Sequence, residues 1–250
     1  MTEARTLVSR PVAHRGLHDR AKGVIENTLG AARAAVDHGF AIECDVQWSS
    51  DGQAMVFHDF ALDRLTTSPG KVADHTAAAL AGLTMKDTTD RIPTLRQLLD
   101  LIGGKVPLIV EIKSAFVGDV RLAKRTVDVL TSYSGPVGIK SFDPAMVIEA
   151  KRLLAGKIPC GVVAMQDYSY FDYEPLSAAD KHALANLLHF NESKPDFISW
   201  KVDDLPCAAP FLCRNALELP LMSWTVRNAE QRAQAAAHAD QMVFEGFVPA

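Results

Sequence analysis

The sequence predicts a single α/β domain, a (β/α)8 barrel of the TIM type. Short apolar runs alternate with longer helical patterns along the chain, and this alternation is typical of parallel βαβ units. About eight such runs fit into 250 residues, which is the usual length of one closed barrel. No Gly-rich phosphate-binding fingerprint follows the first apolar run, and its absence disfavours an open dinucleotide-binding sheet.

Apolar runs mark the expected strands, and longer helix-forming patterns mark the expected helices. Gly39 and the Gly103-Gly104 pair are expected to end two helices, because glycine readily adopts the left-handed conformation. Asn27 is expected to cap the first helix. The expected strands span 11–14, 40–46, 53–58, 107–112, 136–140, 158–164, 196–200, 219–226 and 241–244, and the expected helices span 27–38, 95–102, 119–132, 144–155, 177–189, 208–216 and 229–239.

Two stretches interrupt this alternation within one predicted domain over residues 1–250. Residues 60–94 have many turn residues and little periodicity, so we expect a small insertion there, after the second strand. Residues 165–175 form an aromatic and acidic loop, which fits a pocket rim or lid as well as a self-packed surface loop. The chain ends soon after the last expected strand, so the last outer helix is expected to be missing. The aromatic residues of the loop are Tyr168, Tyr170, Phe171 and Tyr173.

Composition and charge narrow the function classes. The formal net charge is −4, whereas a nucleic-acid-binding protein usually carries a basic face, so we expect a small-molecule partner and no nucleic acid. No apolar stretch is long enough for a membrane helix, and the first ten residues lack the apolar core of a secretory signal. The four cysteines form no CxxC pair. These features predict a cytoplasmic protein without an integral membrane segment, and they leave a homo-oligomer open.

Acidic residues gather at the ends of two expected strands. Glu43 and Asp45 lie two residues apart and therefore share one face of a strand, with Cα atoms roughly 6.5 Å apart. Glu111 and Lys113 share a face in the same way, and barrel enzymes keep their active sites at this end of the strands. Protonation, cationic partners or a bound cation can relieve the cost of burying such a cluster. Three carboxylates suit one hard divalent cation, Mg²⁺ or Ca²⁺, and the alternative is that they pair with Arg or Lys.

Two histidines also close extended runs. A lone histidine of this kind is more often a packing residue, but His14 and His58 both stand beside the acidic strands. Cleavage of a phosphodiester needs a base and an acid, and histidine titrates in the range for both roles. Arg15 and Lys113 are expected to stabilise the negative charge on phosphate. This set of side chains is suited to the cleavage of a phosphodiester.

Over residues 11–113 the order and spacing of these motifs resemble the glycerophosphodiester phosphodiesterase family of the bacterial, cytosolic type. The departures are Ile25 and Ala32, where the family usually has Pro and Phe, and the sequence after the last strand. The matching motifs are His14-Arg15-Gly16, Glu26-Asn27-Thr28, Glu43-Cys44-Asp45, His58-Asp59, Leu62-Asp63-Arg64 and Glu111-Ile112-Lys113. Beyond residue 113 the resemblance is sparse but colinear and includes Trp224-Thr225-Val226, and the departing tail is Phe244-Glu245-Gly246-Phe247-Val248-Pro249.

The resemblance implies a role for each motif. It implies that one divalent cation binds three carboxylates, that two histidines act as acid and base, and that two basic residues bind the phosphate of a glycerophosphodiester. The products would be glycerol phosphate and an alcohol. Trp224 is a further candidate for contact with the substrate. The implied metal ligands are Glu43, Asp45 and Glu111, the catalytic pair is His14 and His58, and the phosphate-binding residues are Arg15 and Lys113.

Three alternatives stay open. The same chemistry could act on a lysophospholipid or a sugar phosphodiester, with the aromatic loop lining an apolar groove. A ligand-binding barrel without catalysis would have no need for two histidines. A Schiff-base enzyme using Lys113 is disfavoured, because that chemistry requires a lysine of lowered pKa and the neighbouring carboxylates would raise it.

Overall fold

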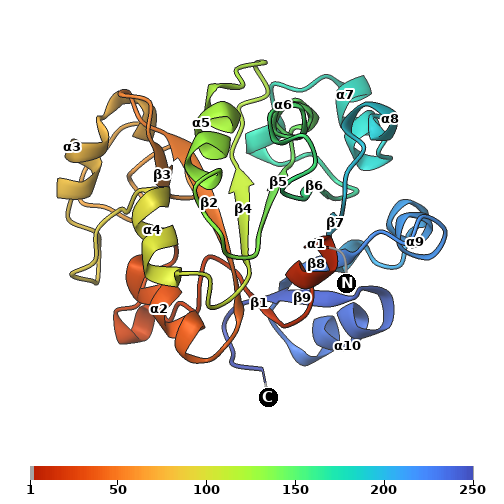
Figure 1. Cartoon of the computed structure of the whole chain (residues 1–250), viewed down its shortest axis with the longest axis horizontal. Helices are drawn as coiled ribbons and strands as arrows, with labels where there is room; N and C mark the ends of the chain where they lie inside the picture. The colour runs from red at the N-terminus through yellow and green to blue at the C-terminus, as the bar shows by residue number, and fades with distance from the viewer. Residues whose placement is uncertain (1–2, 250) are drawn as a thin grey trace.

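Eight parallel strands close into a barrel in the computed structural model, which describes residues 3–249 without the side chain of Phe171. Each strand pairs with the next, and the last one returns to the first, where Val12 lies opposite both Ala41 and Val243. The strands occupy the middle of the molecule (Figure 1). The TIM-type barrel is therefore confirmed. Its strands are β1 (Val12–Ala13), β2 (Ala41–Trp48), β4 (Leu108–Ile112), β5 (Val137–Ser141), β6 (Cys160–Ala164), β7 (Ile198–Lys201), β8 (Leu221–Val226) and β9 (Gln241–Phe244).

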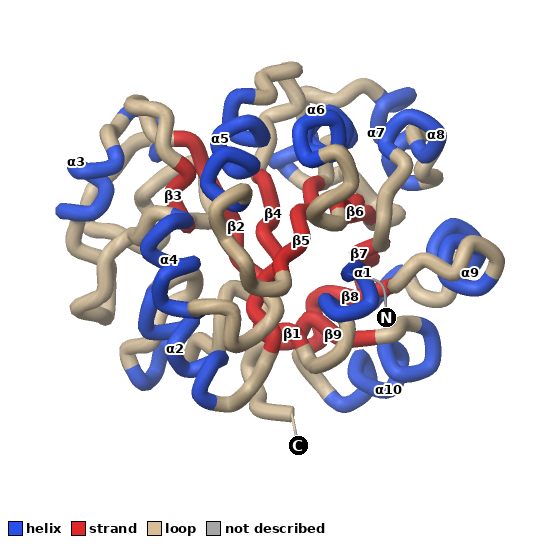
Figure 2. The backbone as a smooth tube through the Cα atoms, viewed as in Figure 1, coloured by secondary structure: helices blue, strands red, loops and turns tan. Residues whose placement is uncertain are grey.

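The helices between the strands form an outer layer around the sheet (Figure 2). Helix α4 shows why the sequence folds this way: its apolar positions point inward, Thr94 and Gln97 form a capping box, and Gly103 ends it at φ 54°. The outer helices are α2 (Leu29–Asp37), α4 (Leu95–Ile102), α5 (Arg121–Leu130), α6 (Pro144–Leu154), α7 (Ala178–Ala185), α8 (Phe190–Ser193), α9 (Ala208–Asn215) and α10 (Ala229–His238), and the short 3-10 turns are η1 (Arg20–Lys22), η3 (Phe171–Tyr173) and η4 (Val202–Asp204).

The expected run 53–58 does not join the barrel. It contributes β3 (Ala54–Val56), which pairs antiparallel with β2 and opens the insertion. The insertion continues through η2 (Val72–Asp74) and α3 (Ala77–Gly82), and it lies at the edge of the molecule beyond α4 (Figure 1). Its place after the second barrel strand is confirmed, although it begins earlier than expected. Its side chains pack into a separate apolar cluster, to which the loop between β1 and α2 adds Ile25. The members from the insertion are Met55, Phe57, Leu62, Leu65, Val72, Leu80, Met85 and Ile92.

A short helix that the sequence did not predict, α1 (Glu3–Leu7), covers part of the amino-terminal end of the barrel. Leu7 is buried in one apolar cluster with Ile109 of β4 and with Phe197, which directly precedes β7. Gly138 makes room for it, because a Cβ at that position would lie 2.3 Å from Cδ1 of Leu7. Apolar packing therefore fills this end of the barrel, and the opposite end carries the polar groups.

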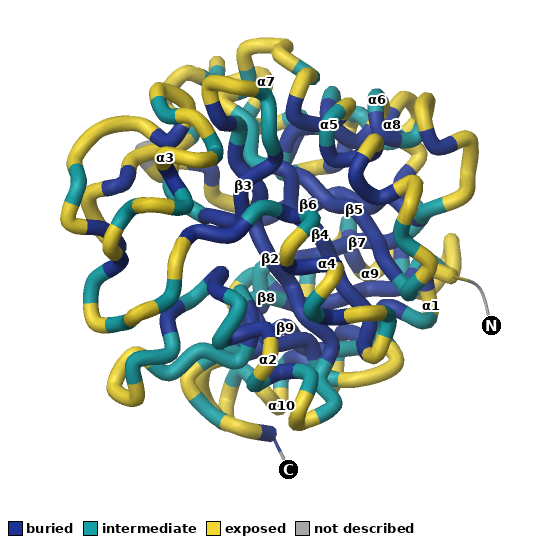
Figure 3. The backbone as a smooth tube through the Cα atoms, turned by 60° about the vertical axis from the view of Figure 1, so that its left-hand side comes forward, coloured by how far each residue is buried: buried dark blue, intermediate teal, exposed yellow. Residues whose placement is uncertain are grey.

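The strands are the most deeply buried part of the fold, and exposed residues gather in the outer loops and helices (Figure 3). Residues 245–249 follow β9 without helical structure. In the part of the chain that the structure describes, no helix has the length and apolar character needed to cross a membrane.

Candidate active site

The three predicted carboxylates meet at the carboxyl end of the barrel. Asp45 on β2 lies directly opposite Glu111 on β4, and Glu43 precedes Asp45 by two residues on the same face. All three are buried, and one oxygen from each lies within 4.8 Å of the others. The pairing of β2 with β4 thus brings together Glu43 and Glu111, which are 68 positions apart in the sequence (111 − 43).

Three cationic side chains neutralise this cluster. Lys140 Nζ lies 3.0 Å from Glu43 and 3.1 Å from Glu111, and Lys113 Nζ lies 3.1 Å from Asp45 and 2.8 Å from Glu111. Arg15 adds a third positive charge, with Nε 3.3 Å from Oδ2 of Asp45. The cationic partners anticipated as one way to stabilise the cluster are therefore present.

Sequence reasoning missed Lys140. It was expected only as the end of a strand, but β5 pairs with β4 so that Lys140 lies opposite Glu111. Its side chain is almost fully buried, with 2% exposed. A single charged residue within an otherwise uncharged, buried strand, VGIKS, is the signal that could have identified it, since buried lysines are rare unless they are paired.

The charges on these groups support one another. Burial opposes ionisation of Glu111, but Lys113 and Lys140 outweigh it and lower its pKa from 4.5 to about 2. For Asp45 the cost of burial is likewise outweighed, mainly by Lys113, and its pKa lies well below the usual range. Burial tends to lower the pKa of Lys140, yet Glu43 and Glu111 raise it above its usual value. Asp45, Glu111 and Lys140 are therefore charged at neutral pH.

The cluster also suits a hard divalent cation. Its donors are all carboxylate oxygens, which Mg²⁺ and Ca²⁺ prefer. Opposite ligands of one Ca²⁺ ion are roughly 4.6–5.2 Å apart, and the three oxygens lie within that span. The buried Oε1 of Glu43 accepts no hydrogen bond of good geometry, although Lys140 is close by. Apart from this ion pair, the oxygen keeps lone-pair capacity that a cation could use.

His14 stands at the end of β1 beside the carboxylates. Its Nδ1 lies 2.5 Å from Oε2 of Glu245, and its Nε2 lies 4.0 Å from Oε2 of Glu43. Burial and the neighbouring Arg15 lower the pKa of His14, although Glu245 and Glu43 act in the opposite direction. Arg227 donates from Nε to Oε1 of Glu245 at 2.6 Å and holds that carboxylate in place.

Glu245 is the second residue that sequence reasoning missed. It lies in the tail that departs from the family pattern, and it reaches His14 only because β9 closes the barrel beside β1. Although the tail differs in sequence from the family pattern, its Glu245 places a carboxylate where β9 meets β1.

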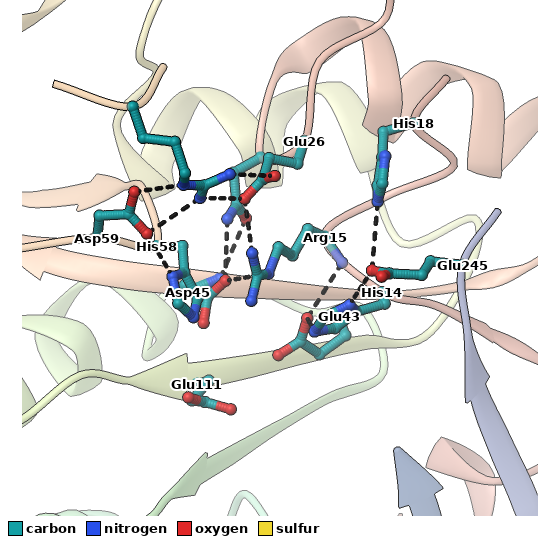
Figure 4. Close-up of polar contacts among 12 residues, drawn as sticks. His14, Arg15, His18, Glu26, Glu43, Asp45, His58, Asp59, Glu111 and Glu245 are labelled. Carbon is teal, nitrogen blue, oxygen red and sulfur yellow. Dashed lines mark hydrogen bonds and ion pairs between the residues drawn. The ribbon is translucent and has the colours of Figure 1, made fainter. Parts of the chain in front are cut away.

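His58 has an arrangement like that of His14. It follows the short strand β3, which belongs to the insertion, and Gln47 on β2 donates to its backbone carbonyl at 2.9 Å. Its Nδ1 lies 2.7 Å from Oδ1 of Asp59. Arg64 donates from Nε to Oδ2 of Asp59 at 2.6 Å. The two imidazoles approach the carboxylate cluster from different elements (Figure 4).

Two residues of the Glu26-Asn27-Thr28 motif hold the site together from the side of α2. Asn27 does not cap this helix; Thr28 does, by accepting from the amide of Ala31. The amide side chain of Asn27 instead donates to Oδ2 of Asp45 and accepts from its backbone N–H. Glu26 pairs with Arg15 at 2.7 Å.

Two cavities open at this end of the barrel and share His58, Glu111, Lys113 and Phe142. The smaller, of about 150 Å³, is lined by both histidines and by Trp224, whose indole N–H donates to the carbonyl of Ser199. Among the predicted site residues, only Glu43 does not line it. Its other predicted residues are Arg15, Asp45, Glu111 and Lys113.

The larger cavity, of about 350 Å³, lies between the insertion and the 165–175 loop. Of the loop's aromatic residues that are described, Tyr173 lines this cavity. Tyr168 is buried against Phe142 and Tyr173, whereas Tyr170 is half exposed and accepts from Lys201. The loop is therefore partly a pocket wall and partly self-packed, and Phe171 lies outside the described side chains.

Comparison with known proteins gives one consistent result. The profile of the "Glycerophosphoryl diester phosphodiesterase family" matches residues 14–248, nearly the whole chain. A glycerophosphodiester phosphodiesterase of Caldanaerobacter subterraneus subsp. tengcongensis is 35% identical over 159 residues, which are 60% of this chain and 63% of that relative. The YhdW protein of Bacillus subtilis is 28% identical over 218 residues, which are 79% of this chain and 88% of YhdW.

Solved structures agree on the fold. An Oleispira antarctica phosphodiesterase in complex with the product sn-glycerol-3-phosphate aligns with a TM-score of 0.78 and 19% identity, covering 96% of this chain and 94% of that one. A Thermotoga maritima glycerophosphodiester phosphodiesterase aligns with a TM-score of 0.70 and 20% identity, covering 93% and 92%. At these identities the likeness concerns the barrel alone.

Proposed function

The chain belongs to the glycerophosphoryl diester phosphodiesterase family, and on that premise we propose that it hydrolyses glycerophosphodiesters to glycerol 3-phosphate and an alcohol. One observation carries the proposal. The cluster of Glu43, Asp45 and Glu111 lies at the active end of the barrel, with His14 and His58 beside it, and a carboxylate holds Nδ1 of each imidazole. A site that only binds a ligand has no use for two imidazoles oriented in this way.

Glu43, Asp45 and Glu111 would hold one divalent cation, Mg²⁺ or Ca²⁺. Such an ion supplies charge stabilisation to a phosphoryl oxygen. Asn27 supports the ligand set by donating to Asp45, and the backbone N–H of Arg15 donates to Glu43. Both contacts fix carboxylate orientation before any ligand enters.

The two histidines divide the proton transfers. Because Glu245 and Asp59 accept from Nδ1, the free nitrogen of each ring is Nε2, and both rings line the smaller cavity. The lowered pKa of His14 keeps this imidazole neutral at pH 7, ready to accept a proton. One imidazole would take the proton of the attacking hydroxyl, and the other would give a proton to the departing alkoxide.

Basic side chains surround the position expected for phosphate. Arg15 and Lys113 both line the smaller cavity and carry full positive charges, held there by Asp45 and neighbouring carboxylates. Their fixed charges oppose the negative charge that builds up on phosphate during cleavage. Trp224 forms an apolar wall of the same cavity and would pack against the glycerol carbons.

A second substrate class has one observation in its favour. The larger cavity is lined by Phe60, Phe116, Phe142 and Tyr173 and has more than twice the volume of the smaller one, about 350 against 150 Å³. An acyl chain carried on the glycerol would remove this aromatic surface from water. A lysophospholipid is therefore the second candidate.

The same reaction can test both substrate classes. Protein stripped of metal by chelation and dialysis is incubated with glycerophosphocholine, glycerophosphoethanolamine, a lysophospholipid and a sugar phosphodiester, before and after Mg²⁺ or Ca²⁺ is added, and products are followed by ³¹P NMR. We expect ion-dependent release of glycerol 3-phosphate from the glycerophosphodiesters, and of its acylated form if the lysophospholipid is a substrate. Full activity after exhaustive chelation would refute the metal assignment, and no turnover of any diester by the reloaded protein would refute the hydrolase.

We also propose a cytoplasmic location. The four cysteines are all free thiols, and such thiols persist in a reducing compartment. Cell fractionation with an antibody against the native protein tests this, and recovery in a secreted fraction would contradict it.

A further inference from the structure

The guanidinium group of Arg64 joins two carboxylates at the edge of the site. It donates to Asp59 from Nε at 2.6 Å and from Nη2 at 3.0 Å. It also donates to Glu26 from Nη1 at 2.9 Å and from Nη2 at 2.8 Å. One planar fork therefore holds both oxygens of each carboxylate, which a lysine ammonium could not do.

Each of these carboxylates holds a different part of the site. Oδ1 of Asp59 lies 2.7 Å from Nδ1 of His58, and Oε1 of Glu26 accepts from Arg15 at 2.7 Å. Each of these oxygens is also bonded to Arg64, so a rotation of either carboxylate would break both of its contacts. Figure 4 shows the contact of Asp59 with His58 and the contact of Glu26 with Arg15.

The positions of these residues suit a permanent contact. Glu26 and Asp59 are mostly buried, with 13% and 23% of their side chains exposed. Burial opposes ionisation of Glu26, but Arg64 and Arg15 outweigh it and lower its pKa to about 2, so the pair stays charged at neutral pH. Arg64 itself is 44% exposed, and exposure alone would suggest an ordinary surface arginine.

We infer that Arg64 is a positioning residue of the hydrolytic site, which acts through Asp59 on His58 and through Glu26 on Arg15. It thereby fixes the proton-transfer group, His58, in position relative to the phosphate-binding group, Arg15. The inference rests on the proposed function. It gives the insertion a part in the chemistry, because Arg64 comes from the insertion whereas Glu26 and Arg15 come from the loop between β1 and α2. The loss of Arg64 would loosen both groups at once.

The main test compares Arg64→Ala and Arg64→Lys with a matched control. Arg20→Ala is that control, because Arg20 also ties the loop after β1 to the insertion, through contacts of 2.8 and 2.6 Å with Asp87, but it touches neither Asp59 nor Glu26. We expect Arg64→Ala to lower kcat/KM roughly 10- to 100-fold, which is typical for groups that orient a ligand or catalyst. Arg64→Lys should restore only a small part, and Arg20→Ala should resemble the parent. An equal loss in Arg20→Ala would overturn the inference, since mere docking of the insertion would then explain it.

Double variants separate the two branches. If Arg64 acts on His58 through Asp59, adding Asp59→Asn to Arg64→Ala should lower kcat little further. If it acts on Arg15 through Glu26, adding Glu26→Gln should raise KM little further. Full additivity in both pairs would overturn the inference. Because Arg64 also lines the larger cavity, each variant is measured on diesters of two different alcohols. A loss that changes with the alcohol would indicate direct contact with the leaving group, and would equally overturn it.

A readout without turnover keeps this test separate from the proposed function. Long-range ¹H–¹⁵N spectra of histidine side chains report which ring nitrogen carries the proton, and His58→Gln identifies the signals of His58. We expect the Nδ1 signal of His58 to shift in Arg64→Ala and to stay unchanged in Arg20→Ala. An unchanged signal in Arg64→Ala would overturn the contact even if the parent enzyme is active. A shifted signal would support it even if no diester is hydrolysed.

Discussion

Glu245 and His14 lie 231 positions apart in the chain, yet Oε2 of Glu245 is 2.5 Å from Nδ1 of His14. The contact has a counterpart in the neighbouring pair of His58 and Asp59, at 2.7 Å. In both pairs a carboxylate is itself held by an arginine, Arg227 in one case. The contact between a carboxylate and Nδ1 is thus made by neighbouring residues for His58, and by the pairing of β9 with β1 for His14.

Glu245→Gln should lower kcat roughly 10- to 100-fold, because a carboxamide accepts a weaker hydrogen bond from Nδ1 and no longer stabilises the protonated ring. Steady-state assays with glycerophosphocholine measure this, and far-UV circular dichroism checks the fold. Glu230→Gln, at an exposed position of α10, is the control. Parental kcat in Glu245→Gln would contradict the orienting role.

His14→Ala and His58→Ala should each lower turnover about 10²- to 10⁴-fold while the barrel stays folded, since each removes one proton-transfer group. His38→Ala serves as the control, because His38 is exposed and its ring contacts only the backbone carbonyl of Ala34 among described polar groups. Near-parental rates in both active-site variants would refute the acid and base assignment.

Lys140→Met should lower the free energy of unfolding by about 3–5 kcal/mol, because it leaves Glu43 and Glu111 buried with less positive charge. Urea denaturation monitored by fluorescence measures the change, with the exposed Lys105→Met as the control. A divalent cation should recover more stability in Lys140→Met than in the parent, since it replaces the missing charge. Equal stability of Lys140→Met and the parent without added ion would contradict the ion-pair role of Lys140.

Glu26 predicts a defined pH dependence of stability. Its folded pKa of about 2 lies below the ordinary 4.5, so its stabilising contribution is complete above pH 4.5 and is lost as the pH falls toward 2. The stability difference between the parent and Glu26→Gln should therefore be constant from pH 7 to 5 and shrink below pH 4.5. Urea denaturation at closely spaced pH values measures it. A gap that is as wide at pH 3 as at pH 7 would contradict the ionised contact with Arg64 and Arg15.

The sequence predicted well those helices whose ends depend on interactions between residues close together in the chain. Helix α4 begins and ends where expected, because its cap, its apolar stripe and Gly103 all act within a few residues. The run 53–58 is extended as expected, but an extended apolar run has the same pattern in a hairpin as in a barrel strand, and only its pairing with β2 separates the two. Asn27 misled because its capping propensity competes with a distant partner, Asp45, and the buried carboxylate wins.

By itself, the sequence determined the barrel and the residue types of its active end, because the alternation of strands and helices and the two-residue period of side chains are local properties of the chain. Only the tertiary structure decided which charges meet. Strand register placed Lys140 opposite Glu111, closure of β9 against β1 carried Glu245 to His14, and the fold of the insertion turned Arg64 toward Asp59. Such contacts join residues that no local pattern links, and the electrostatic energy of a buried charge depends on the partners that packing brings within a few ångströms.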